Sequence, residues 1–383
     1  MLNKKVVIAL NTAWNILNFR SGLIRALVAS GYEVVAVAPP DEYSEGLSDL
    51  GCRFVPFPMD NQGTNPVRDL LLLWQFFKLL RIERPDVFLG YTVKPNVYGS
   101  LAAHALGIPV VNNIAGLGAV FIKGGWLNQL VKGLYRVALS RSRKVFFQND
   151  DDRQLFTSSR LVHVGVTDLL PGSGIDLKKF SPAPLPGTTT VHFLMIARML
   201  WDKGVGEFVE AARLLKQRGV DAEFCLLGFL DVQNPAAISQ QQMNDWIEEG
   251  AICYLGVSDS VWLEIRQVDC VVLPSYREGT PRVLLEAAAM ARPIITTDAV
   301  GCREVVDDGI NGYLCKPKDA SDLADKMEQI AFMPPSEREA MGLRGREIVE
   351  REFDEQIVID KYLAAIDAVL AERKVVSLFR AVG

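Results

Sequence analysis

The stretch that decides the fold runs from Tyr276 to Glu286 and reads YREGTPRVLLE. Apolar residues 270–274 precede it in a pattern typical of a buried parallel strand, and residues 283–290 follow it with helix-forming composition. Pro281 suits the first turn of a helix, where a missing N–H has little cost. The sequence therefore predicts a strand, a loop and a helix N-terminus, an arrangement that offers amide groups and partial positive charge to a phosphate.

Two carboxylates flank this predicted phosphate-binding loop. Glu278 comes just before Gly279, which lets a ligand approach the backbone, and Thr280 and Pro281 complete the loop. Glu286 lies about one and a half turns into the helix. A carboxylate there can accept hydrogen bonds from both hydroxyls of a ribose. We therefore expect one site to hold sugar, phosphate and ribose in a row, the alternative being a helix cap followed by a solvated Glu.

A second loop carries two cations. Arg198 follows the predicted strand at residues 191–197, and Lys203 comes five residues later, next to Gly204. Arg binds phosphate oxygens in pairs and Lys binds them as a point charge. This spacing favours a diphosphate ligand over an ordinary surface loop. Breaking a sugar–diphosphate bond puts negative charge on the diphosphate, and fixed cations there lower the barrier without a metal.

Together these two patterns resemble the signature of the retaining GT-B glycosyltransferases, specifically the large family-4 class. The pattern in question is Arg198, four residues and Lys203–Gly204, followed by Glu278, seven residues and Glu286. The resemblance covers nearly the whole chain. It implies that Arg198 and Lys203 hold the donor diphosphate, that Glu278 lies near the donor sugar, and that Glu286 binds the ribose. The nucleotide sugar is then a substrate, and no cofactor is expected.

The length of 383 residues fits two domains, and strand-like runs alternate with helical stretches in both halves. This alternation predicts an α/β fold with two Rossmann-like parallel-sheet domains. Three prolines within residues 181–190 indicate a linker. We expect an acceptor-binding domain at residues 1–180 and a nucleotide-sugar domain at 188–352. The resemblance to GT-B proteins further implies that the two domains face a cleft and that a helix at 353–373 returns to the first domain.

Net charge and cysteine spacing argue against several classes of protein and site. The net charge of −5 gives no sign of nucleic-acid binding. Six scattered cysteines without a CxxC pair predict neither a zinc site nor a disulfide framework, and they favour a reduced cytoplasmic setting. The N-terminus leads straight into a strand, and the apolar run at residues 70–80 is too short to span a bilayer.

Other residues that resemble known binding or catalytic sites are better explained by structural roles. Asp150, Asp151 and Asp152 form a tempting metal motif, but they stand at the start of a predicted helix, where carboxylates stabilise the N-terminus. We therefore expect no metal site. The Gly116-Leu117-Gly118 run lacks the third glycine of a dinucleotide fingerprint. The three histidines lie within predicted helices or strands and are expected to be structural.

Acceptor binding is expected in the first domain, on three loops that follow predicted strands, because ligands bind at that edge in open α/β sheets. Six residues on these loops are the candidates: Asn15, Arg20, Lys94, Asn96, Gly116 and Gly118. Many relatives carry His-Glu-Pro on the middle loop, where this chain reads Val93-Lys94-Pro95. The usual histidine is thus absent. The leaving diphosphate would take the acceptor proton, and Lys94 would face a phosphate of the acceptor.

The loops at residues 94–96, 116–118 and 277–281 resemble a narrower subgroup. That subgroup adds hexosamine-type sugars to undecaprenyl-diphosphate-linked saccharides in bacterial glycan and O-antigen assembly. The resemblance implies a UDP-sugar donor and a polyprenyl-diphosphate-linked acceptor. Three alternatives stay open: transfer to a soluble acceptor, a non-catalytic nucleotide-sugar-binding protein, and a GT-B epimerase.

Two stretches fit a lipid-linked acceptor. Residues 123–144 interleave apolar side chains with six basic ones, a pattern typical of a helix lying on an anionic membrane surface. We expect this surface to place the protein at the inner face of the plasma membrane. Residues 67–84 form a second candidate, with Trp74, Phe76 and Phe77 among leucines. In the alternative interpretation, each helix packs on a sheet and turns a solvated basic face outward.

Overall fold

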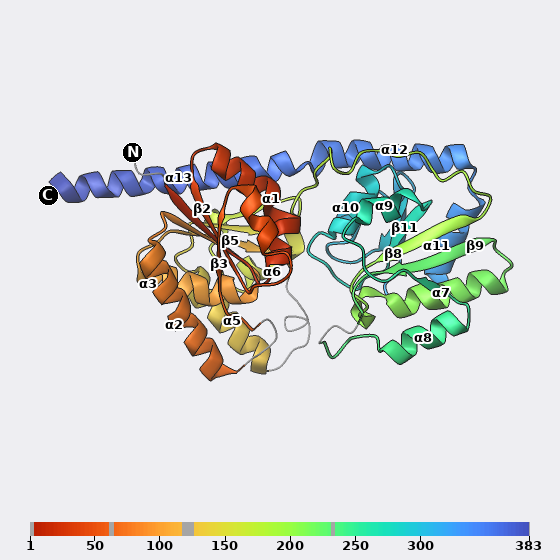
Figure 1. The fold of residues 1–383 in the computed structure, drawn as a ribbon, viewed down its shortest axis with the longest axis horizontal. Coiled ribbons are helices and arrows are strands. Elements are labelled where there is room, and N and C mark those ends of the chain that lie inside the picture. Colours follow the sequence, from red (N-terminus) through yellow and green to blue (C-terminus); the bar gives the residue numbers. More distant parts are fainter. Residues whose placement is uncertain (1–3, 61–64, 117–125, 231–233, 383) are drawn as a thin grey trace. The chain divides into compact units, whose positions relative to one another are not determined.

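The fold comes from a computed structural model that describes residues 4–60, 65–116, 126–230 and 234–382 (Figure 1). The chain divides into two compact units. Unit 1 comprises Met1–Ser173 and Gln356–Gly383, and unit 2 comprises Gly174–Glu355. Each unit holds a sheet in which the paired strands run parallel, with helices on both faces. The predicted α/β architecture of two Rossmann-like sheets is confirmed.

Unit 1 contains a seven-stranded sheet in the order β3-β2-β1-β4-β5-β6-β7. The strands are β1 (Lys5–Ala9), β2 (Glu33–Ala38), β3 (Arg53–Pro56), β4 (Val87–Tyr91), β5 (Val110–Ile114), β6 (Lys144–Phe147) and β7 (Thr167–Leu169). The strand order reverses between β1 and β4, which is where ligands bind in such sheets. A 3₁₀ turn, η3 (Val164–Val166), precedes β7.

One face of this sheet is covered by α1 (Ala13–Ala29), η1 (Glu45–Leu50) and α13 (Glu355–Val382), whose apolar side chains share a core with it. The other face carries α2 (Pro66–Glu83), the π-helix η2 (Pro95–Gly99), α3 (Ser100–Ala105), α5 (Trp126–Leu139) and α6 (Asp150–Ser158). Helix α2 covers all but the last residue of the candidate stretch at residues 67–84. The segment that holds Asn15 and Arg20 was expected to be a loop but is helical, because Thr12 accepts a hydrogen bond from the Asn15 amide and starts α1 at Ala13.

Unit 2 contains a six-stranded sheet in the order β10-β9-β8-β11-β12-β13. The strands are β8 (Val191–Ile196), β9 (Ala222–Leu227), β10 (Cys253–Tyr254), β11 (Cys270–Leu273), β12 (Ile294–Thr297) and β13 (Gly312–Cys315). The helical segments are η4 (Trp201–Lys203), α7 (Val205–Gln217), α8 (Gln240–Glu248), α9 (Val261–Arg266), α10 (Arg282–Ala289), η5 (Arg303–Val305), α11 (Ala320–Phe332) and α12 (Pro335–Glu352). The sequence reading did not anticipate α8 and α9.

A disulfide corrects the expectation of cysteines without partners. Cys225 on β9 and Cys253 on β10 are bonded, with their Cα atoms 4.7 Å apart. The two residues stand opposite each other in the parallel register of the two strands. They are 28 residues apart in sequence and form no short motif, so only the strand pairing reveals the contact. The other four cysteines are buried thiols.

The aspartate run lies where a helix begins, as the sequence predicts. Asn149 is the N-cap of α6, and its side chain accepts a hydrogen bond from the Asp152 amide at 2.8 Å. The first turn of α6 consists of Asp150, Asp151 and Asp152, whose negative charges interact favourably with the positive end of the helix dipole. Over the described residues, no helix is both long and apolar enough to cross a membrane.

Candidate functional site

The candidate donor site of unit 2 stands at the reversal of strand order. Strands β8 and β11 pair in parallel at the centre of the sheet, with Cys270 opposite Phe193 and Val271 opposite Leu194. The two predicted phosphate-binding loops follow these two strands, so both loops start from the same edge of the sheet. Sheets of this type bind ligands in the crevice formed at that point.

Glycine at position 204 lets the two loops approach each other. Gly204 ends η4 with a φ of 78°, a left-handed conformation that suits glycine. A Cβ atom there would lie 2.1 Å from the carbonyl oxygen of Pro274, which begins the loop after β11. The amide of Tyr276 donates a 3.0 Å hydrogen bond to the carbonyl of Asp202. Backbone contact thus fixes the loop after β8 against the loop after β11.

This contact brings Lys203 and Glu278 together. The Lys203 ammonium lies 2.5 Å from Oε1 of Glu278, and the two side chains are only 15% and 17% exposed. The Ser275 hydroxyl donates to the same Oε1 at 2.7 Å, and the Glu278 amide donates to the Val300 carbonyl at 2.9 Å. Both charged groups are therefore held in place before any ligand arrives.

Arg198 differs from Lys203 in its surroundings. Its side chain is exposed, and within the described parts of the chain it makes no ion pair with an Asp or Glu. The two cations are thus unequal: Lys203 is fixed by a carboxylate, whereas the Arg198 guanidinium is open to an incoming anion. A guanidinium in that state can bind two phosphate oxygens at once.

The helix that follows the second loop is α10, and Pro281 is its N-cap residue rather than a residue of its first turn. Pro281 itself contributes no side-chain hydrogen bond to this helix end. One turn further on, Glu286 accepts a 3.0 Å hydrogen bond from Nε of Arg282. Burial raises the pKa of Glu286, and the Arg282 guanidinium opposes that rise. The predicted ribose-binding carboxylate is therefore already paired, and a ribose would have to share or replace Arg282.

Sequence reasoning missed several residues around this loop. Gly301 has a φ of 85°, and a Cβ atom there would lie 2.2 Å from the Glu278 carbonyl oxygen. The Tyr276 hydroxyl donates a 2.6 Å hydrogen bond to Glu207, and the Lys318 ammonium lies 4.8 Å from the centre of the Tyr276 ring. Burial and the Glu207 carboxylate raise the pKa of Tyr276. All of these contacts join residues far apart in sequence, so no local pattern could have indicated them.

The acceptor candidates lie in unit 1, at the edge where β1 and β4 end. Arg20 on α1 is almost fully buried, and its guanidinium lies 4.4 Å from the centre of the Tyr91 ring. Its Nη1 donates to the Phe19 carbonyl at 3.0 Å, whereas its buried Nε has no hydrogen-bond partner among the described residues. Over the described residues Arg20 has no carboxylate within ion-pair distance. A buried cation without a compensating charge is costly and indicates an anionic ligand.

The middle loop of unit 1 adds a strained residue and a paired lysine. Thr92, directly after β4, has a φ of 58°, which is unfavourable for a β-branched residue and typical of functional sites. The Lys94 ammonium lies 3.2 Å from Asp69, with 14% of the lysine side chain exposed. Lys94 is therefore already paired with a carboxylate within unit 1, and an acceptor phosphate would have to share it with Asp69.

Asn96 is fully buried, and its side chain is engaged in the interior of unit 1. Its Oδ1 accepts from Asn112, and its Nδ2 donates to the Asn113 carbonyl at 2.8 Å. Asn113 in turn donates to the Tyr362 hydroxyl on α13. As placed, Asn96 supports the ends of β4 and β5 and does not present its amide to a ligand.

The remaining acceptor candidates are less informative. Asn15 lies in the first turn of α1 and donates to the Asn11 side chain at 2.7 Å. Gly116 follows β5 with a φ of 139°. Gly118 lies outside the described residues. The structure therefore brings Asn15 and Arg20 onto one helix, and it places Lys94 and Asn96 at the end of β4.

Comparison with protein families covers both units. Residues 190–331 match the family described as "Glycosyl transferases group 1", and residues 19–171 match the "Glycosyl transferase 4-like domain". The chain is also 31% identical over 374 residues to a protein of Campylobacter jejuni subsp. jejuni serotype O:2, covering 93% of this chain and 96% of the relative. That relative is the N,N'-diacetylbacillosaminyl-diphospho-undecaprenol alpha-1,3-N-acetylgalactosaminyltransferase.

A second relative and two solved structures agree with this result. An Escherichia coli protein, the UDP-Gal:alpha-D-GlcNAc-diphosphoundecaprenol alpha-1,3-galactosyltransferase, is 24% identical over 69% of this chain and 71% of its own length. Sucrose-phosphate synthase from Thermosynechococcus elongatus superimposes with a TM-score of 0.79 at 17% identity, over 97% of this chain and all of its own. Anabaena HepE with UDP and glucose gives 0.74 at 17% identity, over 94% and 98%. These structures share the fold.

Proposed function

The chain belongs to the group 1 glycosyl transferases, and we propose the following reaction for it. It transfers an N-acetylhexosamine-type sugar from a UDP-sugar to a polyprenyl-diphosphate-linked saccharide. The new bond keeps the anomeric configuration of the donor, and no metal takes part. The reaction serves the assembly of a bacterial surface or protein glycan.

One observation carries the donor half of this proposal. The loops after β8 and β11 hold Lys203 and Glu278 in contact, on the same edge of the sheet as the exposed Arg198. Two cations beside a helix N-terminus supply the charge that a diphosphate requires, which is the role a metal ion has in other enzymes. Gly279, Thr280 and the backbone amides near them would contact the phosphates and sugar.

The chemical step is balanced by the substrates themselves. The bond between the anomeric carbon and the diphosphate oxygen breaks, and UDP leaves with that electron pair. An acceptor hydroxyl oxygen forms the new bond on the same face, and its proton passes to an oxygen of the leaving diphosphate. Arg198 and Lys203 stabilise the developing negative charge, and Glu278 faces the sugar as it becomes electron-poor. Glu286 binds the ribose. No histidine is needed in this scheme.

The choice of substrates is supported by the relatives. The Campylobacter jejuni protein is named for a diphospho-undecaprenol acceptor and an N-acetylgalactosaminyl group, and the Escherichia coli protein is named for a UDP-sugar and a diphosphoundecaprenol acceptor. Within unit 1, the buried and uncompensated Arg20 suits a phosphate of such an acceptor. Asn15, on the same helix, lies one turn nearer the N-terminus of α1.

A lipid-linked acceptor requires the enzyme to work at the inner face of the plasma membrane. The surface predicted for this contact, residues 123–144, keeps few free cations among its described residues. Arg143 pairs with Glu372, Lys144 pairs with Asp168, and Arg136 donates to two backbone carbonyls. Lys132 and Arg141 remain as the cations of this surface that could contact lipid. Lys123 lies outside the described residues.

The proposal is tested by supplying purified protein with a panel of UDP-sugars and a polyprenyl-diphosphate saccharide, and then analysing the product by NMR. We expect one UDP-N-acetylhexosamine to be used, and the new linkage to be α when the donor is α. A product of inverted configuration would contradict the mechanism. Transfer that is equally fast to a free saccharide would contradict the lipid-linked acceptor.

A further inference from the structure

Helix α2 of unit 1 has two apolar faces. Leu72, Phe76 and Leu80 are spaced by four residues and are buried against the sheet. A second set follows the i, i+3, i+4, i+7 pattern and lies roughly opposite the first around the helix. Its members and their exposed fractions are Val67 at 77%, Leu70 at 68%, Leu71 at 53% and Trp74 at 58%. This second face covers nothing within the described parts of unit 1.

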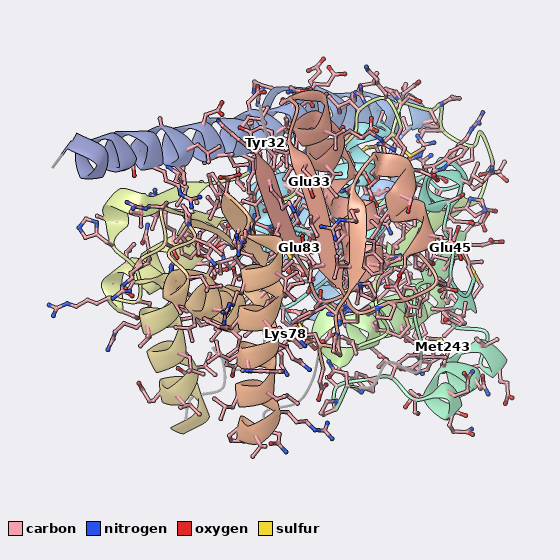
Figure 2. All side chains as sticks on the ribbon, turned by 60° about the vertical axis from the view of Figure 1, so that its left-hand side comes forward. Tyr32, Glu33, Glu45, Lys78, Glu83 and Met243 are labelled. Atoms are coloured by element: carbon pink, nitrogen blue, oxygen red, sulfur yellow. A yellow bond between two sulfur atoms is a disulfide. The ribbon has the colours of Figure 1, made fainter. Side chains whose placement is uncertain are left out.

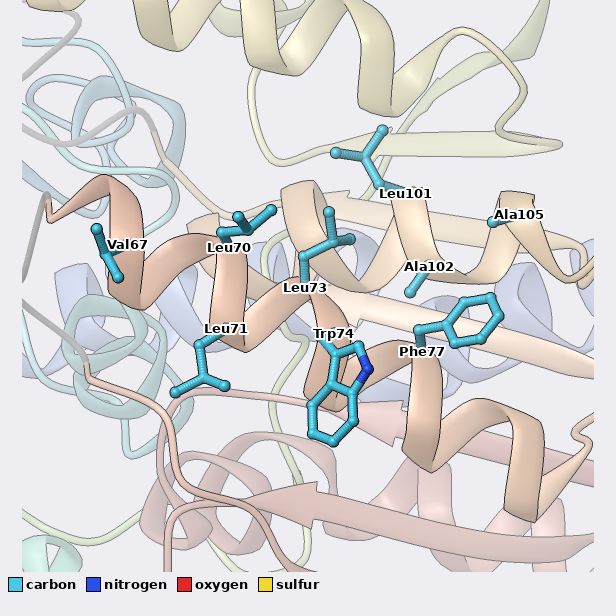
Figure 3. A pocket seen from close by; sticks show the side chains of 9 residues that line it. All are labelled: Val67, Leu70, Leu71, Leu73, Trp74, Phe77, Leu101, Ala102 and Ala105. Carbon is cyan, nitrogen blue, oxygen red and sulfur yellow. The ribbon is translucent and has the colours of Figure 1, made fainter.

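The exposed face borders a groove between α2 and α3, with a volume of about 710 Å³ (Figure 3). Side chains from α2, between Val67 and Phe77, form one wall, and Leu101, Ala102 and Ala105 from α3 form the other. Every residue that lines the groove is apolar. Monomeric proteins rarely expose a continuous apolar surface of this kind unless something binds to it.

The charges on α2 are sorted by face. Both acidic residues of the helix lie toward the sheet side, where Asp69 contacts Lys94 and Glu83 contacts Arg53 and Lys5. On the exposed face, Lys78 and Arg81 follow Trp74 by one and two turns. Figure 2 labels Lys78 and Glu83 on this helix.

The Lys78 ammonium lies 5.6 Å from the centre of the Trp74 ring. Neither Lys78 nor Arg81 has an ion-pair partner within the described residues. The outer face of α2 is therefore apolar over its first two turns, and beyond them it carries two unpaired cations beside the exposed Ile82. This face, comprising Val67, Leu70, Leu71, Trp74, Lys78 and Arg81, is called the α2 face below.

We propose that the α2 face is the surface by which the enzyme docks on an anionic lipid bilayer. Leu70, Leu71 and Trp74 enter the outer hydrocarbon region, and acyl chains fill the α2–α3 groove. Lys78 and Arg81 remain among the anionic headgroups. The charge pattern selects this occupant, because an aromatic and aliphatic end beside unpaired cations matches the boundary between hydrocarbon and headgroups. The proposal rests on the lipid-linked acceptor proposed above, which requires such docking.

The α5 helix, which the sequence favoured for this role, has a different structure. Among its described side chains, Tyr135, Ala138 and Leu139 are buried in the core of unit 1, and Val131 and Leu134 pack partly buried against the same core. Its exposed large apolar side chains include Leu130 at 50% and Val137 at 60%. These two provide a matched control: they have the exposure of Leu71 and Trp74, and they belong to the same unit.

The test measures binding of the full-length protein to sedimenting vesicles, one set containing phosphatidylglycerol and one made only of phosphatidylcholine. We expect the double variant Leu71→Gln/Trp74→Gln to lower the partition coefficient on phosphatidylglycerol vesicles at least about tenfold, because it removes apolar area that the bilayer would bury. The control Leu130→Gln/Val137→Gln should stay within about twofold of wild type. Lys78→Gln/Arg81→Gln should reduce the preference for anionic vesicles.

Each other outcome overturns the proposal. Unchanged vesicle binding by the α2 double variant, or a loss confined to the α5 control, assigns docking elsewhere. A wild-type protein that never binds vesicles but forms a dimer that Leu71→Gln/Trp74→Gln dissociates assigns the α2 face to a second copy. Transfer to a water-soluble acceptor analogue, measured without vesicles, should match wild type in all these variants. That analogue keeps the diphosphate and a short isoprenoid chain; a wild-type protein that uses neither it nor the polyprenyl-diphosphate saccharide would contradict the proposed function and leave the docking result to stand alone.

Discussion

Replacing Lys203 by Met removes the positive charge at the centre of the donor site and keeps the length of the side chain. The wild-type ammonium contacts Glu278 at 2.5 Å, and both side chains are more than four-fifths covered. Breaking a buried ion pair by removing one partner costs about 3–5 kcal/mol. Because Ser275 still donates to the same carboxylate oxygen, we expect Lys203→Met to lower the free energy of unfolding by about 3 kcal/mol.

The expected loss in turnover has a separate cause. Lys203 is held in place before the donor binds, so its charge can stabilise the leaving diphosphate without rearrangement. Removing one such preorganised group costs about 10²–10³ in rate, or about 2.7–4 kcal/mol. A purely structural lysine would show the stability loss without this loss in rate.

A double-variant cycle separates the two effects. Lys203→Met/Glu278→Gln leaves no unpaired charge, so its free energy of unfolding should return to within about 1 kcal/mol of wild type. Its turnover should nevertheless fall about 10²-fold below that of Glu278→Gln alone. Unfolding is followed by denaturant titration and turnover by release of UDP. If the double variant and Glu278→Gln have equal turnover, Lys203 only positions Glu278, and the assignment to the diphosphate is refuted.

Four further predictions test the rest of the site. Arg198→Ala should reduce turnover about 10²-fold with an unchanged thermal midpoint, whereas the control Arg351→Ala, which removes an exposed Arg paired with a neighbouring Glu, should leave both unchanged. Activity should survive EDTA; loss with chelator that Mg²⁺ or Mn²⁺ restores would contradict a metal-free step. Gly301→Ala should reduce turnover at least about tenfold in a folded protein, because the added Cβ would clash with the Glu278 carbonyl and because φ of residue 301 is positive. Near-normal turnover would show that the close approach of Gly301 to Glu278 is not needed for activity. Burial raises the pKa of Glu286, so its carboxylate should take up a proton at a higher pH than an exposed Glu, and KM for the donor should rise as the pH falls through that pKa; Glu286→Gln should flatten this dependence, and an equal pH profile in both proteins would show that Glu286 does not bind the ribose.

Local patterns were sufficient for the architecture and for the two loops of the donor site. Alternation of strands and helices predicted two parallel sheets. Fixed spacing also placed Arg198 and Lys203 on one loop. These features depend on residues close together in the chain, which is why sequence alone could indicate them.

Contacts between distant residues could not be predicted in this way. The Lys203–Glu278 pair spans 75 residues, and it forms only because β8 and β11 are neighbours in the sheet. The Cys225–Cys253 disulfide likewise depends on strand register. Asn96 follows the end of β4, as a ligand-binding residue would, yet its side chain turns inward to Asn112.

Helix starts and helix faces were the other source of error. The segment that holds Asn15 and Arg20 was expected to be a ligand-binding loop, but the hydrogen bond from the Asn15 amide to Thr12 begins α1 at Ala13. The apolar stripe of α5 satisfies the pattern of a membrane-surface helix, yet the core of unit 1 covers it. A stripe in the sequence does not tell whether a sheet or a bilayer will bury it.

The most direct test of the central claim is a comparison of two acceptors under one set of conditions. Purified protein is given its UDP-sugar with either a polyprenyl-diphosphate saccharide in anionic vesicles or the same saccharide without lipid and diphosphate, and kcat/KM is measured by mass spectrometry of the product. The account predicts that the lipid-linked acceptor gains one sugar with a kcat/KM at least about 10²-fold higher. Equal values for the two acceptors, or a product only from the free saccharide, would contradict it.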